Sequence, residues 1–346
     1  NEDVSLTAFA GSVINYANIT ANGGTISLAA YAPDTSAGKG DVSSLNTYNA
    51  NTVLSAGKGV DLGARNNIQN NRDDKVQQGN INITSDNSSV DMGVNSNNAS
   101  KLALYTVEQT GNIIVKADKD IINQTKLQIG DVTNKTGGGS IYLTSAQGGI
   151  TNQGNAELVT ANGNITMLAE KNIVNNGEAY ARGGEIYIES FAGDVNNTDD
   201  FDVYKGTKTD LATSHISIMA KEGTLSNEHN LVSGGNITLV AKNGLQNFSY
   251  YLSAIGDVSL TATAGDLINS TAILSQQGSI YLTAEQGAVI NVAGGAVANM
   301  LAYDVASDSF ALVENISMDK GDLYALGGDV ILRAGGNNDG STKTVL

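Results

Sequence analysis

The 346-residue chain has an acidic, glycine-rich composition that suits short β-strands joined by tight turns. It contains 40 glycines, one proline, no cysteine and no tryptophan, and its formal net charge is −16. That charge disfavours nucleic acid and anionic membrane surfaces as partners. Hydrophobic residues make up 40% of the chain, enough for a continuous core, but no apolar run approaches the roughly 20 residues of a membrane helix, so membrane insertion is not expected.

A motif that reads Gly-x-Ile-x-Leu-x-Ala recurs along almost the whole chain and predicts the first strand of each repeat. Apolar and other residues alternate with period two, which is the spacing of a strand and not of a helix. The third inward position is nearly always small, which leaves room for the chain to turn a corner. The 13 copies have as their first inward residue Val4, Ile26, Val60, Ile81, Ile113, Ile141, Ile165, Ile186, Ile216, Ile237, Val258, Ile280 and Val330.

A second motif places an asparagine two residues after an apolar residue, on the inward face of a second short strand. A buried amide must be hydrogen-bonded, so we expect the asparagines of successive repeats to bond one another along the axis, about 4.7–4.9 Å apart. A ligand-binding role for this column is the alternative. The predicted structural ladder consists of Asn123, Asn152, Asn175, Asn197, Asn227, Asn247, Asn269 and Asn291.

The spacing of the first motif predicts the fold. A shorter third segment closes each unit, as at residues 252–254, and the anchors Ile216, Ile237 and Val258 are 21 residues apart. A unit of this length holds three short strands and three turns, whereas a propeller blade needs about twice that length. We therefore predict one all-β segment over residues 1–346, a right-handed parallel β-helix with about 21–22 residues per coil. The handedness follows the rule for parallel crossovers.

Longer gaps between the anchors predict loop insertions near residues 32–52, 86–110, 199–213 and 293–322. The gap of 50 residues between Ile280 and Val330 fits either a large insertion or one irregular coil with a loop. Such loops usually lie on the surface of a solenoid and often carry its binding function.

Few residues have the pattern of a catalytic or metal site. We expect the acidic pairs at residues 73–74 and 199–200 to be solvated charges in loops. The two histidines, His215 and His229, lack metal-ligand spacing to another histidine or to a cysteine. We therefore predict that the chain is not an enzyme and has no catalytic residue, no metal site and no cofactor.

Three tyrosines, Tyr142, Tyr187 and Tyr281, occupy the first outward position of a predicted first strand. Exposed tyrosines on a flat sheet can stack on sugars or contact proteins, although they are also ordinary strand-forming residues. We retain them as candidate surface-contact residues.

The Gly-x-Ile-x-Leu-x-Ala and Gly-x-Ile-x-Asn frame resembles the filamentous haemagglutinin-like exoproteins of two-partner secretion, which include large adhesins and contact-dependent inhibition proteins. The resemblance covers nearly the whole chain. The Asn-Pro-rich motifs of that family's secretion domain are missing, since Pro33 is the only proline. The resemblance implies a β-helical shaft segment, secreted by a Gram-negative bacterium or held at its outer surface.

We therefore expect a structural and adhesive segment of a long surface or secreted fibre, with an unknown receptor on a host, another cell or a neighbouring fibre. The motif already runs at Val4 and is still present at Val330, so we also expect end-to-end or lateral self-association. Two alternatives stay open. A carbohydrate-active β-helix enzyme, a polysaccharide lyase or hydrolase, would need a cleft of carboxylates on neighbouring coils. An autotransporter passenger domain would be joined to a membrane barrel.

Overall fold

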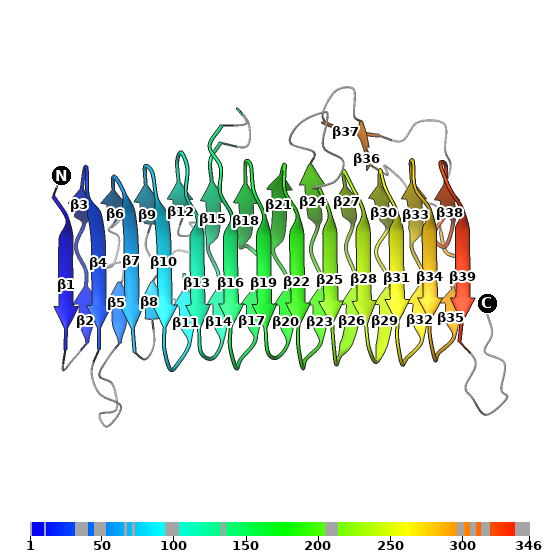
Figure 1. Cartoon of the computed structure of the whole chain (residues 1–346), viewed down its shortest axis with the longest axis horizontal. Coiled ribbons are helices and arrows are strands. Elements are labelled where there is room, and N and C mark those ends of the chain that lie inside the picture. The colour runs from blue at the N-terminus through cyan, green and yellow to red at the C-terminus, as the bar shows by residue number, and fades with distance from the viewer. Residues whose placement is uncertain are drawn as a thin grey trace. The chain divides into compact units, whose positions relative to one another are not determined.

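The computed structural model consists of strands, turns and loops, with no helix in the part of the chain that it describes (Figure 1). The described residues are 2–9, 12–31, 41–44, 53–65, 68–70, 73–93, 104–131, 134, 136–204, 214–295, 301–304, 309–312 and 319–335. The chain divides into two compact units. The first unit is Asn1–Glu170 with Asn175–Glu178, and the second is Lys171–Val174 with Ala179–Leu346.

The first unit is a stack of coils, and each coil gives one short strand to each of three parallel sheets. The first sheet contains β1 (Val4–Ala8), β4 (Thr25–Ala30), β7 (Gly59–Ala64), β10 (Asn80–Ser85), β13 (Ile113–Ala117), β16 (Ile141–Ser145) and β19 (Ile165–Ala169). The second sheet contains β2 (Val13–Asn15), β5 (Val42–Ser44), β8 (Ile68–Asn70), β11 (Val90–Met92), β14 (Ile121–Asn123) and β17 (Ile150–Asn152). The third sheet contains β3 (Ile19–Ala21), β6 (Val53–Ala56), β9 (Asp73–Val76), β12 (Leu104–Val107), β15 (Lys126–Ile129) and β18 (Glu157–Thr160).

The second unit repeats this arrangement, and the boundary between the units falls within β20 (Ile173–Asn175) and β21 (Glu178–Arg182). Its first-sheet strands are β22 (Ile186–Ser190), β25 (Ile216–Ala220), β28 (Ile237–Ala241), β31 (Val258–Ala262), β34 (Ile280–Ala284) and β39 (Val330–Ala334). Its second-sheet strands are β23 (Val195–Asn197), β26 (Thr224–Asn227), β29 (Gly244–Asn247), β32 (Leu267–Asn269) and β35 (Val289–Asn291). Its third-sheet strands are β24 (Phe201–Tyr204), β27 (Leu231–Ser233), β30 (Tyr251–Ala254), β33 (Ala272–Ser275) and β38 (Leu323–Ala325).

The parallel β-helix predicted from the repeat is confirmed, and all 13 predicted first strands are present. In the first unit, β1, β4 and β7 run downward at the front of Figure 1, while β3, β6 and β9 run upward behind them. Because the chain advances from left to right as it turns in this sense, the coil is right-handed.

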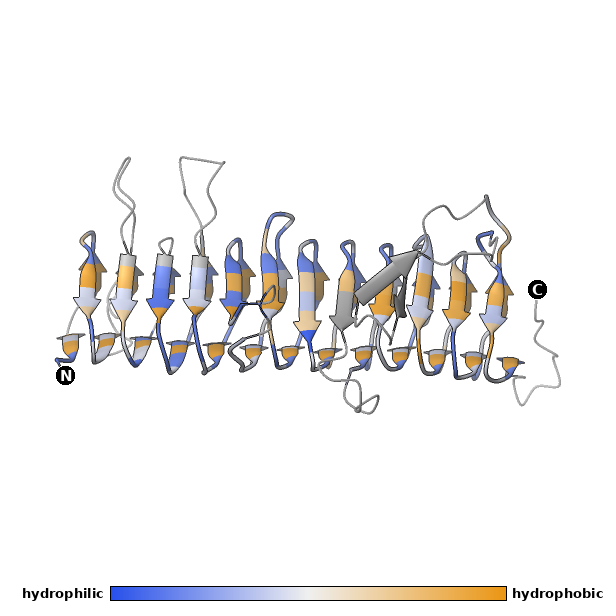
Figure 2. Ribbon diagram, turned by 90° about the horizontal axis from the view of Figure 1, so that it is seen from above, coloured by the Kyte–Doolittle hydropathy of each residue, from blue (hydrophilic) through white to orange (hydrophobic). Residues whose placement is uncertain are grey.

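Equivalent positions of successive repeats lie directly beside one another. In the second unit Ile216 pairs with Ile237, Ile237 with Val258 and Val258 with Ile280, and all four side chains are fully buried. Figure 2 shows hydrophobic residues on the strands and hydrophilic residues in many of the turns. The core is therefore a set of apolar columns, each of which is one position of the repeat.

The predicted insertions at 32–52, 86–110 and 199–213 were too wide. The first range contains β5, the second contains β11 and β12, and the third contains β24, all of which are ordinary strands of their coils. The motif did not mark β5 and β11 because Ser44 and Met92 replace the asparagine at the end of the strand. Pairing with the adjacent coils holds these strands in register without it.

The insertion near 293–322 lies within a single coil, since β34 pairs directly with β39 and β33 pairs with β38. It contains an antiparallel hairpin of β36 (Leu301–Asp304) and β37 (Ser309–Leu312). β36 lies against β27 and β30 of the third sheet. The outward-facing side chains of Val232 and Ser253 on those strands are 1% and 0% exposed.

The expectation that the acidic pair at 73–74 lies in a solvated loop was wrong. These residues begin strand β9, and Asp74 is fully buried. It pairs with Leu54 of one adjacent coil and Tyr105 of the other, both of which are also fully buried. The register imposed by these two coils places the Asp74 side chain in an inward column in spite of its polar carboxyl group.

Candidate functional site

The predicted asparagines form inner hydrogen-bonded ladders at the end of the second-sheet strands. In each step the side-chain Nδ2 of one asparagine donates to Oδ1 of the next, and the N···O distances are 2.7–2.8 Å. In the first unit the ladder runs Asn123, Asn152, Asn175; in the second it runs Asn197, Asn227, Asn247, Asn269, Asn291. All except Asn291 are fully buried.

Many of these amides make a second bond that fixes the corner between the second and third strands. Nδ2 of Asn123 also donates to the carbonyl of Thr125, and Nδ2 of Asn269 donates to that of Thr271. An amide nitrogen has only two hydrogens. Where both are used within the stack, the asparagine has no donor left for a ligand, so its role is structural.

The ladder of the first unit begins at Asn123 because the residue beside it in the preceding coil is Met92, which has no amide. The hydroxyl of Thr125 donates to Oδ1 of Asn123 at 2.6 Å in place of the missing amide. Both Met92 and Thr125 are fully buried. A break in the asparagine column is therefore closed by a local hydroxyl.

A further row of side chains, which the sequence analysis missed, joins the coils at the corner before the first sheet. The backbone N–H of one residue donates to the side chain at the same place in the preceding coil, as from Asn112 to Asn80 and from Asp257 to Asn236. His215 belongs to this row, because its Nδ1 accepts the N–H of Asn236 at 2.9 Å. The signal was the short polar side chain that precedes most first strands.

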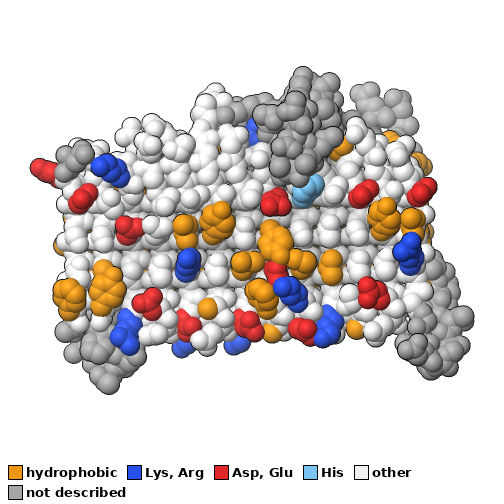
Figure 3. Space-filling model, viewed as in Figure 1, with side chains coloured by type: hydrophobic (Ala, Val, Ile, Leu, Met, Phe, Trp, Pro, Cys, Tyr) orange, Lys and Arg blue, Asp and Glu red, His pale blue; other side chains and the backbone are white. Residues whose placement is uncertain are grey.

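The three candidate tyrosines lie on the outward face of the first sheet and are partly exposed, Tyr142 in the first unit and Tyr187 and Tyr281 in the second. β25, β28 and β31 separate Tyr187 from Tyr281, so these two do not form one patch. This face is largely uncharged, with scattered hydrophobic and charged side chains (Figure 3).

Tyr187 belongs to a local polar network. Its hydroxyl donates to Glu189, which is 5% exposed and pairs with Lys221. The Lys221 ammonium lies 4.5 Å from the centre of the Phe191 ring. Burial, followed by the hydrogen bond to Glu189, raises the pKa of Tyr187 well above its usual value. The hydroxyl therefore stays protonated and committed to Glu189.

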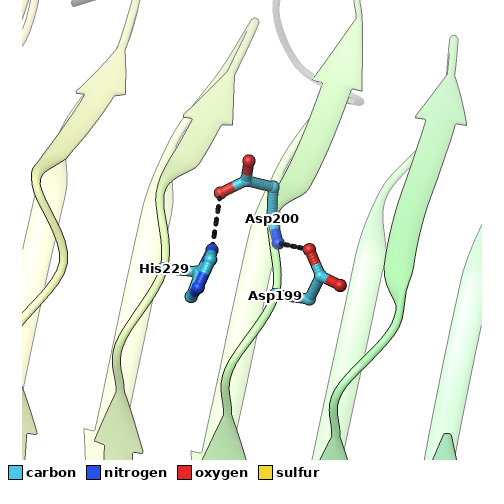
Figure 4. Close-up of side chains that lie close together, drawn as sticks. All are labelled: Asp199, Asp200 and His229. Atoms are coloured by element: carbon cyan, nitrogen blue, oxygen red, sulfur yellow. Dashed lines mark hydrogen bonds and ion pairs between the residues drawn. The ribbon is translucent and has the colours of Figure 1, made fainter. Parts of the chain in front are cut away.

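The described residues include one group of three metal-ligating side chains, Asp199, Asp200 and His229, at the corner between the second and third sheets (Figure 4). One donor atom from each side chain lies within 4.8 Å of the other two. His229 Nδ1 is 3.3 Å from Asp200 Oδ1, and that oxygen also accepts the N–H of Asn230 at 3.0 Å. Asp199 Oδ1 accepts the N–H of Asp200 at 2.8 Å.

This group was not apparent in the sequence because Asp199 and His229 are 30 residues apart. Each stands two residues after a ladder asparagine, Asn197 or Asn227, and those two residues pair in register. The pattern asparagine-x-ligand in consecutive repeats was thus the signal that could have revealed it. Carboxylate oxygens and an imidazole nitrogen are groups that can hold a cation.

No protein-family model, curated protein or solved structure matches this chain. None of the described residues belongs to a helix of the length and hydrophobicity that crossing a membrane requires.

Proposed function

We propose that the chain is a structural and adhesive segment of a long bacterial surface or secreted fibre and that it carries no catalysis. The observation that supports this proposal is that the repeated residues bond one coil to the next. Its apolar positions, its inner asparagines and its corner acceptors all bind the same position of a neighbouring coil. A sequence constrained in this way favours the extension of a stack over the construction of one active site.

The proposed partner is a receptor on a host, on another cell or on a neighbouring fibre. The outward tyrosines and the hairpin of β36 and β37 are the candidate contact regions, because surface additions to a solenoid commonly carry recognition. The resemblance to the two-partner secretion exoproteins supports a Gram-negative cell surface as the location. Nucleic acid is disfavoured by the net charge of −16.

Immunogold electron microscopy of intact cells of the source organism tests the location. Antibodies raised against the folded segment should label filaments outside the cell, and beads coated with the segment should adhere to target cells. Label confined to the cell interior, or beads that adhere no better than beads coated with an unrelated acidic protein, would contradict the proposal.

A polysaccharide panel tests the enzymatic alternative. The segment should release neither reducing ends nor unsaturated uronic acids from acidic and neutral polysaccharides. Turnover that is lost in Asp200→Asn would favour a carbohydrate-active enzyme over a fibre segment, because Asp200 belongs to the corner with the carboxylates and a histidine.

A further inference from the structure

The corner that carries Asp199, Asp200 and His229 is held rigidly by the inner ladder. Nδ2 of Asn197 donates to the carbonyl of Asp199, and Nδ2 of Asn227 donates to the carbonyl of His229, both at 2.9 Å. Asn197 also donates to Asn227 at 2.8 Å. Asp199 and His229 therefore occupy equivalent places on consecutive coils, where their backbones are fixed relative to each other.

The corner itself requires neither an acidic residue nor a histidine. The same place in other coils, two residues after the ladder asparagine, is occupied by residues without a charged side chain, namely Thr125, Gly154, Gly177, Ser249 and Thr271. Where the ladder amide bonds this place it uses only the backbone carbonyl, as at Gly177. The turn therefore forms in other coils without an aspartate or a histidine, although here Asp199 Oδ1 accepts the N–H of Asp200.

The distance between the facing donor atoms of His229 and Asp200 is compatible with a shared metal ion as well as with a long hydrogen bond. The 3.3 Å between His229 Nδ1 and Asp200 Oδ1 exceeds the usual N–H···O distance of about 2.9–3.0 Å. Two ligands at about 2.0–2.1 Å from a tetrahedral zinc ion are about 3.3–3.4 Å apart. Figure 4 shows the Asp200 carboxylate and the His229 ring facing each other, whereas the Asp199 carboxylate lies on the other side of the Asp200 backbone, where it accepts the N–H of Asp200.

The surroundings of the two carboxylates suit a metal site. The N–H of Asn230 bonds Asp200 Oδ1 and orients the carboxylate, as second-shell donors commonly do for metal ligands. Asp199 is partly exposed and its Oδ1 accepts the N–H of Asp200, so its side chain must rotate to bring an oxygen to an ion held by the other two residues. His229 is exposed, so an ion can enter from solvent.

We propose that Asp199, Asp200 and His229 bind one Zn²⁺ ion that joins two consecutive coils, with water at the fourth position. An imidazole nitrogen with two carboxylates selects zinc over calcium and magnesium, which prefer sites made entirely of oxygen. The two carboxylates balance the charge of the ion. This proposal does not depend on the fibre function.

Isothermal titration calorimetry of the untagged protein with zinc chloride, after chelator treatment and dialysis, tests the site. We expect one zinc ion per chain and a rise in the thermal unfolding midpoint on binding. His229→Asn and Asp200→Asn should each weaken zinc binding by at least tenfold. His215→Asn is the matched control, because His215 is the only other histidine and an asparagine can accept the same N–H; it should bind zinc as the wild type does.

Circular dichroism of each variant checks that the coil is intact. The site is wrong if the wild type binds no zinc at millimolar concentration. It is equally wrong if binding persists unchanged in a folded His229→Asn variant, or if His215→Asn removes the binding instead. Tighter binding of calcium than of zinc would overturn the assignment of the metal.

Discussion

At the scale of single residues, Asn247 offers the most direct test of the inner ladder. It accepts from Asn227 and donates to Asn269, and all three side chains are fully buried. Asn247→Leu should lower the free energy of unfolding by about 1–3 kcal/mol, because a buried donor and a buried acceptor lose their partner. Urea denaturation measures this loss. Gln246→Leu, at the exposed neighbouring position, is the control and should change stability by less than about 0.5 kcal/mol; equal effects would argue against the ladder as a stabilising element.

Asp91 is a residue whose charge opposes folding. Burial, and then the nearby charge of Asp120, raise the pKa of its carboxyl above 3.8. The unfolded chain therefore releases this proton at lower pH than the folded chain does, so the folded state loses stability as the pH rises through the folded pKa. Asp91→Asn should therefore be more stable than the wild type at pH 7 and unfold at a higher urea concentration. The gain in the free energy of unfolding should be at most about 1 kcal/mol, because solvent partly screens this carboxyl.

The difference between Asp91→Asn and the wild type should shrink toward zero near pH 3, where the carboxyl is neutral in both states. Asp86→Asn makes the same change of net charge at an exposed position and is the control. A gain that is equal for both variants, or one that does not depend on pH, would show that net charge and not the place of Asp91 is responsible.

At the scale of the strands, two ion pairs that each join neighbouring coils should differ in strength. Lys221 pairs with Glu189, whose side chain is 6% exposed, whereas Lys242 pairs with Glu222, whose side chain is 57% exposed. Lys221→Ala should cost about 1–3 kcal/mol because it leaves a nearly buried carboxylate without its cation. Lys242→Ala should cost less than about 1 kcal/mol. Chemical denaturation of the two variants measures the contrast, and equal losses would contradict it.

The strands also show how far the sequence determines the fold. Strands that carry the motif, such as β28 and β31, were predictable because the alternation of apolar residues indicates both their register and the face that points inward. Strands such as β9 and β11 were not, since Asp74 and Met92 hide the pattern and only pairing with adjacent coils fixes them. The corner that brings Asp200 and His229 together was also missed, because the stacking of the coils and not the distance along the sequence determines which residues of different coils lie close together.

At the scale of the whole molecule, the stability of a stacked repeat is approximately a sum of coil and interface terms. Each coil of the second unit presents its neighbours with equivalent columns. Val258, Leu267 and Ile273 pair with inward apolar residues on both sides. Such a molecule should tolerate the deletion of an entire coil far better than the deletion of part of one. An enzyme built around one cleft should not tolerate the deletion of a coil that forms the cleft.

Deletion of residues 258–279, one complete coil, is the test. It would place Ile237 beside Ile280, Leu245 beside Val289 and Leu252 beside Leu323, so every inward column continues with an apolar residue. We expect a cooperatively unfolding β protein by circular dichroism, with a smaller dependence of the unfolding free energy on urea because less surface is exposed on unfolding. Deletion of residues 258–268 alone is the control and should fail to fold at this point of the stack, because it removes β31 and most of β32 and so joins β30 to β33, two strands of the same sheet, without the first and second strands that must lie between them. If the complete deletion is as disruptive as the partial one, the coils are not the interchangeable units that a fibre shaft requires.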